Sequence, residues 1–138
     1  MENAISIFTL IFLMITIFIL LEAKNTDVIY VKSSVDGRKY LVRNLPDKDK
    51  AADILAITRK KLMKLCDILE IKYKKNKAIV RLIKNFRPDN LSESDGNSKY
   101  TSYAVNKGEK IVFCLRSRNS KEKLVDPNLL MFVALHEL

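Results

Sequence analysis

The residue pair His136-Glu137 is the feature of this sequence with the clearest chemical potential. His136 is the only histidine in the chain, and both residues follow an apolar helical stretch, where a polar pair is costly unless something uses it. In an HExxH pattern, two histidines one helical turn apart bind zinc, and the glutamate between them polarises the zinc-bound water. His136, Glu137 and Leu138 supply the first three letters of that pattern. The alternative is that His136-Glu137 is only the solvated end of a helix.

The element that carries this pair is expected to be a buried helix. It begins at Asp126-Pro127, because Asp is a strong N-cap residue and Pro is favoured at the first helical position. Residues 129–135 are apolar all round, so we expect the helix to be buried on most sides.

Two hairpins are expected before this helix. In the first, residues 28–32 and 39–43 are β-branched or aromatic runs separated by an Asp-Gly turn. In the second, a strand over 101–105 and an apolar strand from residue 110 flank the polar turn at 106–109. The sequence therefore predicts an antiparallel sheet.

A long amphipathic helix is predicted over residues 47–71, between the two hairpins. Pro46-Asp47 starts it, and its apolar residues fall on one side of a helical wheel. The apolar segment 78–86 fits either a helix or a strand, and residues 87–99 form a polar loop rich in turn formers. Cys66 and Cys114 are interpreted as small buried hydrophobic residues, not as reactive thiols or a disulfide.

The N-terminal segment predicts a membrane anchor. Residues 4–21 contain no charge over 18 positions, about the length of helix that a bilayer core requires. A cleaved signal peptide is the first alternative, but it would have a positively charged start and a shorter apolar run, whereas this segment starts with Glu2 and is long. A buried helix of a soluble protein is the second alternative, but this stretch has no polar face. Positive charges follow the segment, so the rest of a single-pass membrane protein would face the cytosol.

The part after the anchor is strongly basic. All 25 Lys and Arg follow residue 23, whereas two of the 16 acidic residues, Glu2 and Glu22, precede it, which leaves +11 on the remainder. Such a charge favours anionic lipid or nucleic acid as partners, although it also serves solubility beside a membrane.

Residues from about Phe86 to Leu138 resemble the WLM and SprT-like zincin metallopeptidases. The matching pieces are Asn106-Lys107-Gly108, the strand from Lys110 to Arg116, and the terminal LLMFVALHEL. Versions of this domain with an N-terminal membrane segment occur in large DNA viruses, so the resemblance implies an anchor in a viral or host membrane. The resemblance implies that His136 is the first zinc ligand, that Glu137 is the general base, and that the strand before the last helix binds an extended peptide by edge pairing.

The combined expectation is an α+β protein with three parts. They are a short tail over 1–3, a transmembrane helix over 4–22, and a zincin-like domain over 23–138, with an antiparallel sheet packed on the long helix and the active-site helix. Catalytic zinc needs three protein ligands, so we expect the chain as written to be inactive and the domain to continue in a longer protein. The expected function is a zinc-dependent peptidase acting on a protein or peptide. The alternative is a non-catalytic basic domain that binds anionic lipid, nucleic acid or a virion protein.

Overall fold

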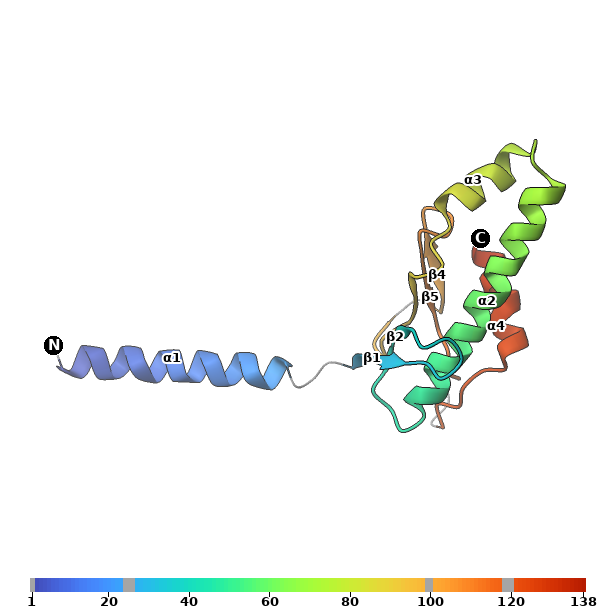
Figure 1. Ribbon diagram of the computed structural model, residues 1–138. Coiled ribbons are helices and arrows are strands. Elements are labelled where there is room, and N and C mark those ends of the chain that lie inside the picture. The colour runs from blue at the N-terminus through green and yellow to red at the C-terminus, as the bar shows by residue number, and fades with distance from the viewer. Residues whose placement is uncertain (1, 24–26, 99–100, 118–120) are drawn as a thin grey trace.

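The computed structural model describes residues 2–23, 27–98, 101–117 and 121–138, with the side chains of 6–21 described in the first helix. One sheet forms a layer, the helices α2 and α4 cover one face of it, and α3 lies near the far end of α2 (Figure 1). The elements in chain order are α1 (Glu2–Ala23), β1 (Val28–Lys32), β2 (Lys39–Arg43), α2 (Lys48–Lys72), α3 (Lys77–Asn85), β3 (Leu91–Glu93), β4 (Tyr103–Val105), β5 (Lys110–Phe113) and α4 (Pro127–Glu137).

The sheet is mixed, so the expected antiparallel sheet is wrong. Its strand order is β1-β2-β3-β5-β4, and both hairpins form as expected, with β1 antiparallel to β2 and β4 antiparallel to β5. However, β3 lies between the hairpins and is parallel to β2 and to β5. The cause is the helical connection: α2 and α3 carry the chain back along the sheet, so that the next strand enters in the same direction as β2.

The core lies between the sheet and α2. The apolar side of α2 contributes Leu55 and Leu62, and β5 contributes Ile111 and Phe113, all four fully buried. Leu55 and Leu62 follow the apolar pattern from which the long helix was predicted, and the helix begins and ends within one residue of its predicted limits. Residues 77–85, where the pattern fitted a helix or a strand, are helical.

Helix α4 is less buried than its composition predicts. Asp126 caps its N-terminus, since the carboxylate accepts a hydrogen bond from the Asn128 backbone amide at 2.8 Å. Only Leu130 and Ala134 are fully buried, where α4 packs against α2 and β5. Phe132 is 69% exposed, and Leu129 and Leu135 are exposed beside it. The expectation of burial on most sides is wrong, because the described elements cover one side of the helix.

The expected transmembrane helix is corrected as well. Helix α1 begins at Glu2, so residues 2–3 of the expected tail are helical, and Met1 lies outside the described residues. Its apolar side chains are largely exposed, and it stands apart from the other elements (Figure 1). Within the described part of the chain, no helix is long and apolar enough to cross a membrane.

Candidate functional site

His136 and Glu137 line a cavity of about 360 Å³ at the end of α4. His136 is exposed and Glu137 is half-buried. Phe132 and Val133, one turn earlier, add apolar surface to the same wall. The opposite wall comes from the second hairpin, with Thr101 and Ser102 before β4, and Cys114 and Arg116 after β5. The cavity therefore lies between the last helix and the sheet edge that precedes it in sequence.

The hairpin wall of this cavity is held by local hydrogen bonds. The Ser102 hydroxyl accepts a hydrogen bond from the Cys114 backbone amide at 3.0 Å, and the Cys114 thiol donates to the Arg116 carbonyl at 3.4 Å. Both cysteines are free, as expected. Cys66 is buried as expected, and this burial raises the pKa of its thiol. Cys114 is only half-buried and faces the cavity, so the interpretation of a fully buried residue is wrong for it.

The turn at 106–108 fixes the end of α4 against the hairpin. Asn106 and Lys107 have positive φ angles of 48° and 59°, and Gly108 has a φ of 101°. The Asn106 side-chain amide donates to the Glu109 carboxylate at 2.7 Å. Gly108 approaches Leu138 so closely that a Cβ atom there would lie 2.9 Å from a Leu138 methyl carbon. The absence of a side chain at Gly108 thus lets the turn pack against the residue that follows His136-Glu137.

The edge strands of the described sheet are β1 and β4, and neither is the strand that the resemblance indicated; β4 is the one beside the cavity. The resemblance implied that the strand from Lys110 to Arg116 would pair with a peptide, but β5 already pairs with β3 on one side and β4 on the other. In the described sheet β4 stands last in the strand order, so its outer edge has no neighbouring strand. This edge continues directly from the cavity wall at Thr101 and Ser102.

The residues present do not complete a metal site. Across the ranges that the structure describes, no group of three His, Cys, Asp or Glu side chains is arranged to hold a metal ion. A catalytic zinc ion needs three protein ligands, and His136 is the single histidine of the chain. The expected zinc ion therefore does not fit the described residues by themselves.

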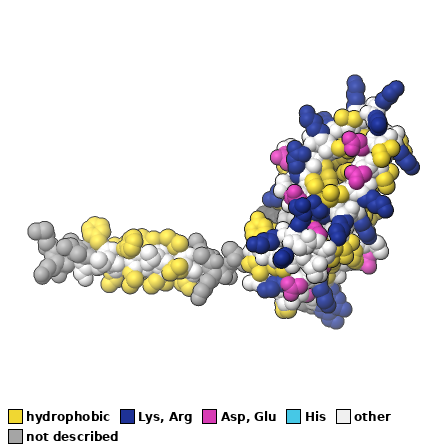
Figure 2. All heavy atoms as spheres, in the orientation of Figure 1, with side chains coloured by type: hydrophobic (Ala, Val, Ile, Leu, Met, Phe, Trp, Pro, Cys, Tyr) yellow, Lys and Arg dark blue, Asp and Glu magenta, His cyan; other side chains and the backbone are white. Residues whose placement is uncertain are grey.

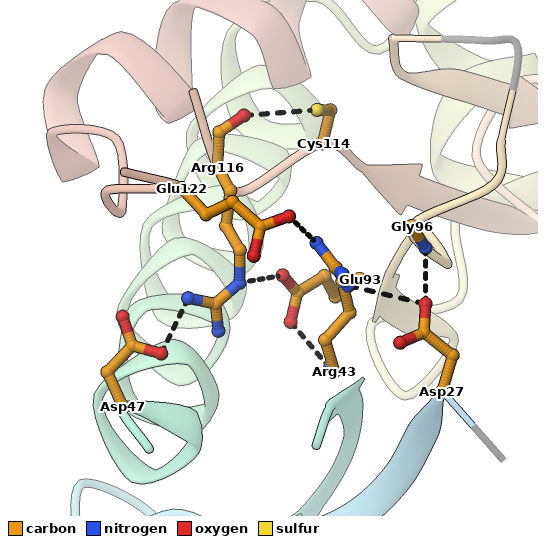
Figure 3. Close-up of polar contacts among 8 residues, drawn as sticks. All are labelled: Asp27, Arg43, Asp47, Glu93, Gly96, Cys114, Arg116 and Glu122. Atoms are coloured by element: carbon orange, nitrogen blue, oxygen red, sulfur yellow. Dashed lines mark hydrogen bonds and ion pairs between the residues drawn. The ribbon is translucent and has the colours of Figure 1, made fainter. Parts of the chain in front are cut away.

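A network of ion pairs borders the same hairpin wall, and its centre is the buried Arg116 (Figure 3). The Arg116 side chain is 5% exposed, and its Nε donates to the Glu93 carboxylate at 2.8 Å. Its Nη1 donates to Asp47 at 2.5 Å. Asp47 is the residue before α2, and its side chain makes no capping hydrogen bond there. Arg116 therefore ties the start of α2 to β3 and to the cavity that holds His136 and Glu137.

Arg43 continues the network toward β1. Its backbone amide donates to Glu93 at 2.7 Å, and its guanidinium pairs with Glu122 at 2.8 Å and with Asp27 at 3.3 Å. Asp27 also accepts a hydrogen bond from the Gly96 backbone amide (Figure 3). Four regions that are distant in sequence, at residues 27, 43–47, 93–96 and 116–122, thus meet through two arginines.

Glu93 carries the least solvated charge of the network. Its side chain is 1% exposed. Burial raises the pKa of this carboxyl above its ordinary value, and the opposing effects of the Arg43 amide and the Arg116 guanidinium do not fully offset that burial. The ion pair of Glu93 and Arg116 therefore connects buried parts of the fold, and the charge state of Glu93 depends on the groups around it.

Sequence reasoning did not find Glu93 or Arg116. Glu93 lies in a segment, 87–99, that was interpreted as a polar loop, and β3 has three residues with no apolar alternation. The one available signal is an arginine after the apolar run 111–115, because a charge beside a buried strand needs a partner.

The chain has a viral relative. "Uncharacterized protein R325" of Acanthamoeba polyphaga mimivirus is 39% identical over 138 residues, which cover 97% of this chain and 70% of the relative. The chain belongs to the family of this protein. No family model matches it, and no solved structure does.

Proposed function

We propose that the folded part of this chain is the substrate-binding part of a zinc-dependent metallopeptidase domain of the WLM and SprT-like type. The single observation that carries the proposal is the cavity between α4 and the second hairpin, which His136 and Glu137 line together. A hydrolytic site needs a carboxylate and a metal ligand open to substrate, and both residues are accessible there.

The position of β4 at the edge of the sheet supports binding of an extended peptide. A peptide that paired with β4 would continue past Thr101 and Ser102 into the cavity and meet α4 at Phe132. Main-chain hydrogen bonds would provide the affinity, and the exposed Phe132 ring would favour an apolar side chain. The substrate class is thus an unfolded or flexible protein segment.

The proposal requires further metal ligands from outside the described residues, because His136 alone does not hold zinc. A first test is the codon order after Leu138 in the gene. A further residue and then a histidine would place the second histidine one turn after His136, on the same helix face. A stop codon at that point would rule out the peptidase.

The second test is the zinc content of the protein translated from the whole reading frame. We expect about one zinc ion per chain, and loss of that zinc on substitution of His136→Ala. Because His136 is exposed, the His136→Ala variant should keep the fold. Circular dichroism of the variant and the wild type checks that it does. Zinc retained at the wild-type ratio in His136→Ala would contradict the assignment of His136.

A further inference from the structure

The connection between α2 and α3, and α3 itself, carry a dense group of positive charges. From Ile71 to Pro88 the sequence has seven Lys and Arg and no Asp or Glu. All seven are exposed, and the six that lie from the end of α2 through α3 form a surface that we name the basic tip: Lys72, Lys74, Lys75, Lys77, Arg81 and Lys84. Figure 2 shows Lys and Arg side chains projecting at this end of the molecule.

The cations of the basic tip are not used in the fold. The ion pairs formed among the described residues involve Arg38, Arg43, Arg59 and Arg116, and none involves the basic tip. Helix α3 needs no charge for its own start, because the Asn76 side chain accepts hydrogen bonds from the Ala78 and Ile79 amides. The charge is therefore available for a partner.

Exposed apolar side chains stand among these cations. Ile71 is 72% exposed, Tyr73 is 51% exposed and Val80 is 49% exposed. Beside them lies a cavity of about 320 Å³ between the end of α2 and α3, whose apolar wall is Ile79, Val80 and Ile83. Lys74 and Lys84 line the same cavity together with Tyr73 and one carboxylate, that of Glu70. Positive and apolar surface therefore occur together at one end of the fold.

We propose that the basic tip docks on an anionic lipid surface. Each Lys or Arg near such a surface contributes about 1 kcal/mol of attraction. The exposed aliphatic residues decide between lipid and nucleic acid, because Ile71 and Val80 gain by burial at the boundary of headgroups and acyl chains but offer no stacking platform for bases. Tyr73 suits that boundary, with an apolar ring and a polar hydroxyl. The proposal is independent of the peptidase and of α1.

The first test uses the absence of tryptophan from the chain. In full-length protein, Tyr73→Trp places a single reporter in the basic tip, and Phe132→Trp places one at an exposed position on α4. Vesicles of phosphatidylcholine are compared with an about 7:3 mixture of phosphatidylcholine and phosphatidylserine. We expect blue-shifted emission and quenching by brominated lipid for Tyr73→Trp with the mixed vesicles only, and no dependence on phosphatidylserine for Phe132→Trp. Equal responses of the two reporters, or none at position 73, would overturn the proposal.

The second test separates specific docking from net charge. On the Tyr73→Trp background, the triple substitution of Lys74, Lys75 and Lys77 by Gln is compared with the same substitution of Lys50, Lys107 and Lys110, which are exposed elsewhere. We expect the first triple to weaken binding to the mixed vesicles by about 10- to 100-fold and the second by less than about threefold. Equal losses would overturn the proposal. A single-stranded oligonucleotide that depends on the three tip lysines while vesicles do not would assign the surface to nucleic acid instead.

Discussion

Arg116 and Glu93 form an ion pair, with Nε 2.8 Å from the carboxylate, in a position where both side chains are almost completely removed from water. Arg116 lies just after β5 and Glu93 ends β3, so the pair connects two adjacent parallel strands at the level where the chain turns toward α4. Arg116 also lines the cavity of His136 and Glu137. The buried pair therefore helps to fix the wall of the candidate site.

Truncation of Arg116 should be strongly destabilising. Arg116→Leu leaves Glu93 and Asp47 without their shared cation, and breaking a buried pair in this way costs about 3–5 kcal/mol in the free energy of unfolding. Urea denaturation of the two proteins measures the difference. The matched control is Arg38→Gln, because Arg38 and Asp89 form an exposed pair for which a loss below about 1 kcal/mol is expected. Equal losses for the two variants would show that the Arg116 pair is not a structural connection.

The pH dependence of stability should report on Glu93. The pKa of Glu93 is raised in the folded protein. At pH values between its pKa in the unfolded state and its pKa in the folded state, the native protein therefore binds more protons than the unfolded protein. The contribution of Glu93 to stability is thus fully present below the unfolded pKa and is lost as the pH rises through the raised pKa. The unfolding free energy of the wild type minus that of Glu93→Gln should fall as the pH increases from about 4.5. A difference that grows with pH would mean that the arginines outweigh burial.

The backbone at Gly108 should not tolerate a side chain. Gly108 has a φ of +101°, and an added Cβ would lie 2.9 Å from Leu138 and 3.3 Å from the Phe86 ring. We expect Gly108→Ala to reduce the unfolding free energy by about 2 kcal/mol through conformational strain and crowding. Gly37→Ala is the control, since its φ is also positive but its nearest neighbour would be 3.8 Å away, and about 1 kcal/mol is expected. Thermal melts of both variants provide the comparison, and a smaller loss at Gly108 would refute the close approach.

The N-cap of α4 should matter for stability. Asp126→Ala removes the acceptor for the Asn128 amide, with an expected loss of about 1 kcal/mol in the unfolding free energy. Asp126→Asn keeps an acceptor oxygen and should cost less than about 0.5 kcal/mol. Denaturant titration distinguishes the two, and equal losses would point to the charge of Asp126 and not to its capping bond.

Local patterns in the sequence predicted the elements, but not all of their pairings. The limits of β1 and β2, the turn at Gly108 and the start of α4 followed from turn residues, alternation and capping chemistry. The strand β3 was not predicted because it is short and mostly polar. Its place in the sheet includes the ion pair between Glu93 and Arg116, which lies after β5 and is distant in sequence. The mixed sheet follows from β3, so missing one short strand altered the predicted sheet.

The candidate site was predicted in part. His136 and Glu137 were chosen because they are the polar end of an apolar helix, and their role as zinc ligand and base stays a prediction. The cavity that they line also includes Thr101, Ser102 and Cys114. Those three contributions come from the path of the second hairpin and carry no motif of their own. The exposure of Phe132 was also not predictable, because composition alone does not say which side of α4 the rest of the fold covers.

Contact of residues 4–22 with a lipid bilayer stays a prediction that nothing in the fold tests.

The most direct test of the peptidase account is hydrolysis of an unfolded protein substrate by the product of the whole reading frame, compared between wild type and Glu137→Gln. Gln at this half-buried position preserves size and shape, so the fold and zinc content should be unchanged. The account predicts that the wild type cleaves the substrate, that a zinc chelator abolishes cleavage, and that Glu137→Gln lowers the rate by at least about 100-fold. Cleavage by Glu137→Gln at the wild-type rate, or no cleavage by a zinc-loaded wild type, would contradict it.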